Sequence, residues 1–215
     1  MPHNPYTPPT AQVDGVEEKT AFDFSGNADY SFTPKQLWWA GVFCLLSVVL
    51  TPVYFFFIFT APSVPVLKDF SVATAFVMTG LTIYIYLLFK KLLNEKSGFH
   101  AANLAISLYI LISIISALAA PFGSSTDTSL TTTLIAVGEL VLGGSIAIYL
   151  GIQLLRCEDP LLGQSKPIAY LTIATGITLA SVVLALLGVL ISIVLGIVMA
   201  ILFFRASKAL TQVQG

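Results

Sequence analysis

Residues 168–204 read IAYLTIATGITLASVVLALLGVLISIVLGIVMAILFF and carry no charged side chain, and the first charge after them is Arg205. An α-helix rises about 1.5 Å per residue, so one straight helix over this stretch would be roughly 55 Å long. The hydrocarbon core of a bilayer is only about 30 Å thick. We therefore expect two membrane-spanning helices joined by a turn with almost no polar residue. One long span is the alternative.

The composition of the whole chain supports a membrane protein. Hydrophobic residues make up 56% of the sequence and charged residues 10%. Several apolar runs exceed the roughly 18 residues needed to cross a bilayer, and they are continuous rather than alternating. Continuous runs favour helices over a β-barrel, so we predict an all-α, polytopic membrane helical bundle whose first partner is the lipid bilayer. The net charge of −1 gives no general attraction to nucleic acid.

The predicted transmembrane domain covers residues 37–206 and contains six spans arranged as three hairpins. These spans cover approximately residues 38–60, 70–89, 101–120, 131–155, 168–186 and 189–205. Residues 1–36 are rich in proline and acidic side chains, which predicts a disordered cytoplasmic tail. Its aromatic residues are expected on the membrane surface or on a partner: Phe22, Phe24, Tyr30 and Phe32. Residues 207–215 are predicted to form a short cytoplasmic tail.

The distribution of lysine and arginine predicts the orientation, because these residues are retained on the cytoplasmic side. With six spans and the N-terminus inside, Lys68 is the one basic residue outside. The inside then carries the other nine: Lys19, Lys35, Lys90, Lys91, Lys96, Arg156, Lys166, Arg205 and Lys208. With five spans, Arg205 and Lys208 would be external, so we favour six spans and two cytoplasmic termini. The last turn is predicted near 186–189, where Gly188 adopts turn conformations at little cost.

Small residues recur every four positions in the last third of the chain. One row is Thr172, Gly176 and Ala180, and another is Gly188, Ser192, Gly196 and Ala200. Small side chains let membrane helices approach closely. We interpret the two rows as a helix-packing seam, either within the protein or against a second copy.

Three short pieces of sequence carry a resemblance: Lys91-Leu92-Leu93-Asn94 with Phe99-His100, Lys166-Pro167 leading into Tyr170-Leu171-Thr172-Ile173, and Phe203-Phe204-Arg205-Ala206. Together they resemble a group of uncharacterised inner-membrane proteins of bacteria. The resemblance covers roughly the last 130 residues and implies a multi-pass protein of the bacterial inner membrane. Such relatives are expected to carry a proline near 186–187, where this chain has two leucines. The resemblance brings no known activity.

Glu139 is the one charged residue inside a predicted span and is the candidate intramembrane polar site. A bare carboxylate in lipid is costly, and intramembrane acids are functional candidates by default. The carboxyl is expected to be protonated, to lie in a wet cavity, or to bond hydroxyls from the second and third spans. Those hydroxyls are Thr79, Thr82, Ser113 and Ser116. A hydrogen-bonded helix clamp is the structural alternative to a proton or cation path.

Signatures of catalysis and metal binding are absent from the sequence. There is no His-Glu-x-x-His, no Gly-x-Ser-x-Gly and no phosphate-binding glycine loop. His100 with Cys157, Glu158 or Asp159 lacks the spacing of a zinc site. We predict no enzyme activity, no catalytic or metal-binding residue and no cofactor. The favoured function is a non-catalytic membrane protein that packs with itself or with a membrane partner. The alternative is a small transporter or channel with Glu139 in its path.

Overall fold

The computed structural model describes residues 30–60, 66–123, 130–157, 161 and 163–214, and within these ranges the secondary structure is entirely helical. The predicted tail therefore lies outside the described residues up to position 29. The six helices are α1 (Pro34–Thr60), α2 (Val66–Ser97), α3 (Asn103–Gly123), α4 (Leu130–Leu155), α5 (Ser165–Ala180) and α6 (Ala185–Gln214).

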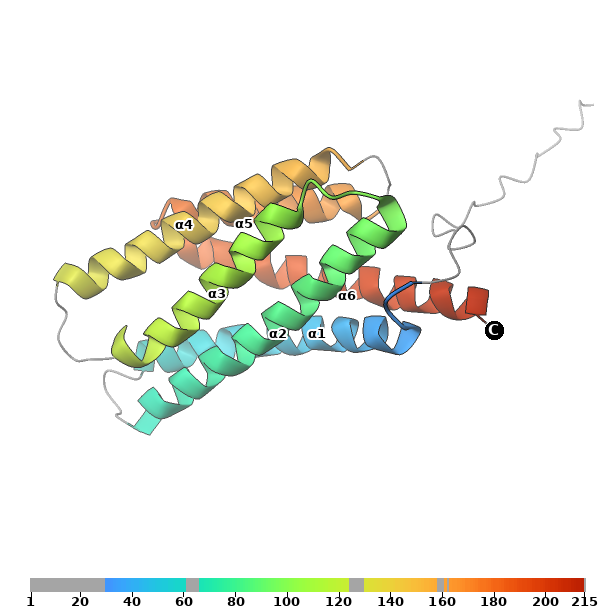
Figure 1. Ribbon diagram of the computed structural model, residues 1–215. Helices are drawn as coiled ribbons and strands as arrows, with labels where there is room; N and C mark the ends of the chain where they lie inside the picture. The colour runs from blue at the N-terminus through green and yellow to red at the C-terminus, as the bar shows by residue number, and fades with distance from the viewer. Residues whose placement is uncertain (1–29, 61–65, 124–129, 158–160, 162, 215) are drawn as a thin grey trace, which may run out of the picture.

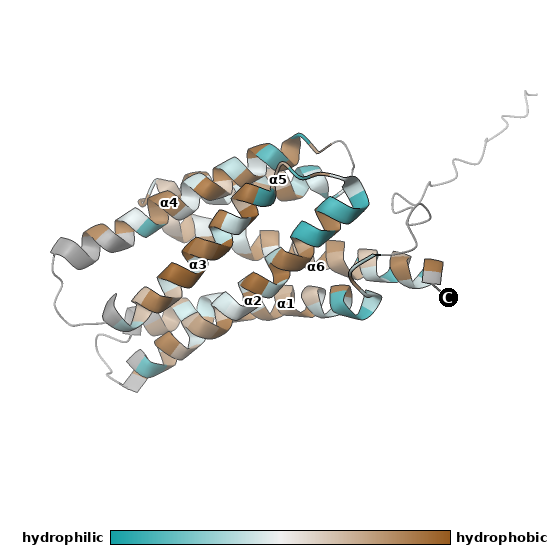
Figure 2. Cartoon of the chain, in the orientation of Figure 1, coloured by the Kyte–Doolittle hydropathy of each residue, from teal (hydrophilic) through white to brown (hydrophobic). Residues whose placement is uncertain are grey.

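Five of these helices, all except α5, are long and apolar enough to cross a membrane. Large apolar side chains cover the outside of the bundle, with Leu104, Leu118 and Leu190 each about 60% exposed. Figure 2 shows the apolar colouring along the middle of the helices and the polar colouring concentrated toward one end. An exposed apolar surface of this extent fits lipid rather than water, and the chain is an integral membrane protein.

The helices form a closed ring. Each helix packs against its neighbours in the chain, and α6 returns to pack along α1 (Figure 1). The most extensive contacts join α4 to α5 and α1 to α6, whereas α3 is the least tightly packed helix. In a ring of this order α1 lies opposite α4, and α2 lies opposite α5.

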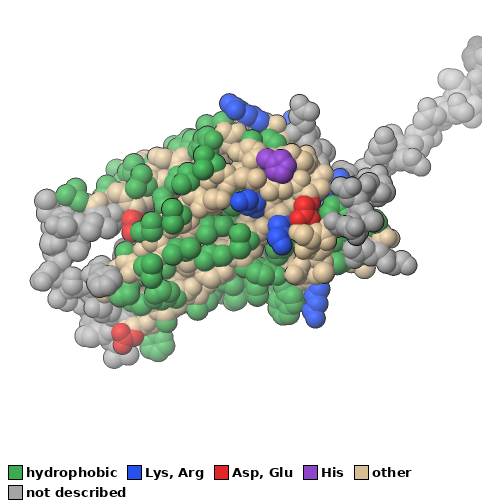
Figure 3. Space-filling view, viewed as in Figure 1, with side chains coloured by type: hydrophobic (Ala, Val, Ile, Leu, Met, Phe, Trp, Pro, Cys, Tyr) green, Lys and Arg blue, Asp and Glu red, His purple; other side chains and the backbone are tan. Residues whose placement is uncertain are grey.

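The start of α1 and the end of α6 lie at the same end of the bundle, which we call the basic end (Figure 1). Since the helices alternate in direction, eight of the nine basic residues predicted on one side belong to this end, and the ninth, Lys19, lies outside the described residues. Figure 3 shows lysine, arginine and histidine side chains gathered at this end of the visible face. Lys68 lies in the first turn of α2, at the opposite end.

The turn between α5 and α6 lies at residues 181–184, earlier than the predicted position near 186–189. Ser181 closes α5, and its hydroxyl oxygen accepts the N–H of Leu184. Val182 adopts the left-handed conformation, with φ of 58°. Gly188 is instead buried inside α6 against Thr178 and Leu179 of α5. The small size of Gly188 permits close helix packing, and the hydroxyl of Ser181 stabilises the turn.

Two helices extend beyond their predicted spans at the basic end. α2 continues to Ser97 because Leu92 and Leu93 are fully buried, and it stops at Gly98, whose φ is 61°. α6 continues through the predicted C-terminal tail to Gln214 because Leu210, among others, is fully buried. Apolar residues in these polar-looking segments therefore prolong the helices.

Candidate functional site

The closest approach between helices is the contact of α4 with α5. A Cβ on Gly144 would lie 2.6 Å from the carbonyl oxygen of Gly176 and 2.7 Å from the backbone nitrogen of Ala180. A Cβ on Gly151 would lie 2.8 Å from the carbonyl oxygen of Ala169. Real Cβ atoms essentially never approach below 3.0 Å, so only glycine fits at Gly144 and Gly151.

The row on α5 faces this contact. Gly176 packs on Gly144 and on Ile148, and Ala180 lies beside Gly144. Thr172 is buried and donates its hydroxyl to the carbonyl of Ile168 on its own helix. The α5 row is therefore directed at α4, within the protein.

The row on α6 faces two other helices. A Cβ on Gly188 would lie 2.8 Å from the hydroxyl oxygen of Thr178 on α5, and one on Gly196 would lie 2.6 Å from a methyl carbon of Val48 on α1. Ala200 is 1% exposed, and Ser192 is half-buried and donates to Val189 of its own helix. The α5 row thus lies at the contact of α4 with α5, and the α6 row at the contacts of α6 with α5 and with α1.

The sequence reasoning did not single out three further glycines at close helix contacts. They are Gly144 and Gly151 on α4 and Gly41 on α1, where a Cβ would lie 2.7 Å from the ring of Phe204. A search for glycines seven residues apart would have found the α4 pair, which recurs on one helix face.

Glu139 lies in the first turn of the apolar part of α4, which begins at Val137. Its side chain is half-buried. It belongs to the half of α4 toward the end opposite the basic end.

The predicted hydroxyl partners of Glu139 are engaged elsewhere or not bonded to it. Thr79 donates to the carbonyl of Ser113, joining α2 to α3, and Ser113 donates to the carbonyl of Tyr109. Among the described side chains, none of the four hydroxyls bonds the Glu139 carboxyl. The clamp predicted from these residues is therefore not formed.

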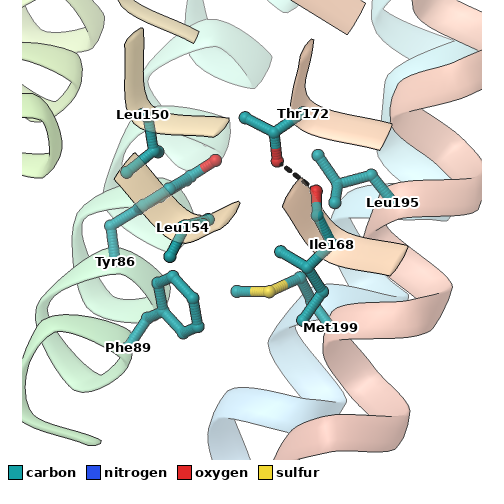
Figure 4. Close-up of a pocket in the computed structure, with 8 residues that line it drawn as sticks. All are labelled: Tyr86, Phe89, Leu150, Leu154, Ile168, Thr172, Leu195 and Met199. Atoms are coloured by element: carbon teal, nitrogen blue, oxygen red, sulfur yellow. Dashed lines mark hydrogen bonds between the residues drawn. The ribbon is translucent and has the colours of Figure 1, made fainter. Parts of the chain in front are cut away.

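A narrow pocket lies inside the ring nearer the basic end (Figure 4). Tyr86 and Phe89 of α2 face Ile168 and Thr172 of α5 across it, with Met199 of α6 alongside. The remaining lining residues are Leu150, Leu154 and Leu195. The space available is about 10 Å³, which holds about one water molecule.

The segment that precedes α1 packs against the helices at the basic end. Phe32 is 1% exposed and belongs to the hydrophobic core. Beside it, Ser31 donates its backbone N–H, at 2.7 Å, and its hydroxyl to the carboxylate of Glu95 at the end of α2. Ser207 of α6 donates to the carbonyl of Pro34 at 2.8 Å. We call residues 30–33 the strap, because they tie α1 to α2 and leave Phe32 inside the core.

The burial of Phe32 corrects the expectation that this aromatic lies on the membrane surface or on a partner. Phe22 and Phe24 lie outside the described residues.

Other residues at the basic end were also considered from the sequence, namely His100, Cys157, Glu158 and Asp159. Over the described part of the chain, no group of three or more His, Cys, Asp or Glu residues is placed to hold a metal ion. His100 is exposed, with its ring nitrogen 3.4 Å from the side-chain nitrogen of Asn103. Cys157 is buried, and Glu158 and Asp159 lie outside the described residues.

The comparisons leave the function to be inferred from the chain itself. No protein-family model, curated protein or solved structure matches this sequence.

Proposed function

We propose that this chain is a non-catalytic protein of the bacterial inner membrane that crosses the bilayer six times and acts by packing against a membrane partner. Both chain ends would then lie in the cytoplasm. The observation that carries the proposal is the use of the small residues inside the ring, at Gly144, Gly176, Gly188 and Gly196. Because these residues complete the fold of one chain, contacts with other proteins fall to its outer surface and its acidic tail.

The orientation is supported by the gathering of basic residues at one end. Arg156 lies there directly after α4, Lys166 on α5 and Arg205 on α6, and such residues are retained on the cytoplasmic side. The test is the reactivity of Lys208→Cys with a membrane-impermeant maleimide. Reaction in inside-out but not in right-side-out vesicles is expected, and the reverse result would overturn the orientation.

The outer surface of α3 is the best candidate for contact with a partner. α3 packs least against the rest of the ring. Its exposed side chains follow one stripe: Leu104, Leu111, Ile115 and Leu118. Spacings of seven, four and three residues keep these side chains on one helix face. A partner helix could therefore lie along α3 without opening the ring.

Site-specific photocrosslinking in native membranes tests this role. A photoreactive amino acid at Leu111, which is 51% exposed, is expected to give one protein adduct of defined mass. The control position is Ala105 on the same helix, which is fully buried and should give no intermolecular adduct. Adducts that are multiples of the chain itself would identify the partner as a second copy. Lipid adducts alone at Leu111, Ile115 and Leu118 would refute a partner on α3.

The second candidate is a small transporter or channel, which the half-buried Glu139 within the candidate membrane span of α4 supports. An ionisable group within membrane-spanning helices is a common element of proton and ion paths. Purified protein in liposomes should then carry a proton-dependent flux that Glu139→Gln abolishes. Absence of flux in the wild type and in Glu139→Gln, tested with protons and monovalent cations, would favour the first proposal.

A further inference from the structure

The turn between α5 and α6 presents an apolar surface at the end of the ring opposite the basic end (Figure 1). Val183 at its tip is 90% exposed, the highest value among the exposed large apolar residues of the described chain. Leu184, Leu186 and Leu187 beside it are 47%, 65% and 46% exposed. In water, this contiguous group of aliphatic side chains would be an association hazard.

The backbone of this turn satisfies its own donors. The N–H groups of Ser181, Val182 and Val183 bond to the carbonyls of Ile177, Leu179 and Ser181 respectively. The N–H of Leu184 bonds to the hydroxyl of Ser181, and that of Ala185 bonds to the carbonyl of Val182. Five consecutive donors thus find partners within the protein, as a non-helical segment in a hydrocarbon environment requires. A turn in water has no such requirement.

The lengths of α5 and α6 limit the distance of this turn from the basic end. α5 contains 16 residues, which span about 24 Å, less than the core of about 30 Å. α6 needs the 20 residues from Ala185 to Phe204 to reach Arg205, about 30 Å of helix, and tilt shortens this height. Both helix lengths place the turn at the edge of the hydrocarbon core or inside it.

We infer that the α5–α6 turn lies among the acyl chains of one leaflet and that its exposed aliphatic side chains bind lipid tails. The occupant is lipid because the surface offers Val183, Leu184 and Leu186 with no charged residue between 168 and 204. The other segments predicted at this end carry proline with hydroxyl or acidic residues, as in 121–130. The bilayer should therefore thin locally beside α5, since a short hydrophobic segment draws the surface toward it.

Spin-label accessibility in liposomes tests this placement. In a Cys44→Ala, Cys157→Ala background, a label is attached at Val183→Cys. The matched control is Asp69→Cys, at an exposed position in the first turns of α2 at the same end of the ring. The label at 183 should collide mainly with oxygen, and the label at 69 mainly with a water-soluble nickel chelate. We expect roughly tenfold less nickel accessibility at 183, because the chelate does not enter hydrocarbon.

Two results would overturn the inference. One is nickel accessibility at 183 equal to that at 69, which would place the turn in water. The other is protection of the label from both oxygen and nickel, which would mean that protein, and not lipid, covers the turn. If Val183→Cys does not fold, Leu186→Cys on the first turns of α6 gives the same reading, with the same two outcomes. The inference rests on membrane insertion alone, so neither a missing partner nor a flux through Glu139 would affect it.

Discussion

Adding one methyl group at Gly144 should separate α4 from α5, while adding it at Gly143 should not. A Cβ at Gly144 would lie 2.6 Å from the backbone oxygen of Gly176, about 0.8 Å short of the 3.4 Å at which ordinary contact begins. The obstructing atoms belong to the backbone, so side-chain rotation does not relieve the clash. At Gly143, the neighbouring residue on the same helix, a Cβ would meet nothing within 4 Å.

The two substitutions should therefore change the free energy of unfolding in opposite directions. Overpacking a tight contact costs about 1–3 kcal/mol, and a gap of 0.5–1 Å forfeits a quarter to a half of each dispersion contact along the joint. Gly143→Ala removes a glycine from a helix interior and should stabilise by up to about 1 kcal/mol. Both variants gain this helix propensity, so we expect Gly144→Ala to be less stable than Gly143→Ala by the overpacking cost, about 1–3 kcal/mol.

Unfolding by titration with SDS in bicelles measures this difference, with tryptophan fluorescence as one probe and circular dichroism as a second. Each variant should insert in the membrane, since both substitutions leave the hydropathy of α4 nearly unchanged. Equal unfolding midpoints for the two variants would refute the tight α4–α5 joint. A second control is Gly80→Ala on α2, which also meets nothing within 4 Å and should behave like Gly143→Ala.

Three further changes test other parts of the ring. Phe32→Ala should destabilise the protein by about 3 kcal/mol or more in the same unfolding assay, because a fully buried aromatic ring leaves a cavity; the control Phe76→Ala, at a position that is 46% exposed, should change little. Ser181→Ala should cost about 1–3 kcal/mol, because it leaves the N–H of Leu184 unpaired in an apolar setting; Ser145→Ala removes only a bond to its own helix, and an equal loss there would contradict the role of Ser181. Glu139→Gln should shift the unfolding free energy by less than about 0.5 kcal/mol, since no hydrogen bond to a described side chain is lost; a large loss would reveal a structural bond.

The sequence predicts the helical class and the doubling back of residues 168–204, because both depend on hydrophobic length. It misplaces the turn, since glycine serves close packing as well as turns, and at Gly188 packing determines its role. It also leaves the direction of each small-residue row open, because a period of four identifies a face but not the helix opposite that face. Six spans and cytoplasmic termini stay predictions, as do the roles of Glu139 and of the seam.

The burial of Phe32 was missed for a different physical reason. The composition of residues 1–36 is that of a disordered tail, and averaging over this window hides its last few residues. Contacts made in the folded chain determine their position: the core packing of Phe32, the bonds of Ser31 to Glu95, and the bond of Ser207 to Pro34. The two hydrogen-bonded pairs join residues 64 and 173 positions apart, so only the assembled ring reveals them.

The two ends of the ring differ in how they are held. At the basic end, the strap, the glycine-terminated end of α2 and the extension of α6 give polar contacts and fixed positions. At the other end, the α5–α6 turn carries exposed aliphatic side chains and no charged residue, with its backbone donors internally paired. A helical ring held by polar contacts at the basic end, with lipid around the α5–α6 turn, can tilt or shift at the turn with little loss of hydrogen bonding. The weakly packed α3, which has the fewest contacts to resist such a shift, is therefore the helix whose surface a partner could most easily engage.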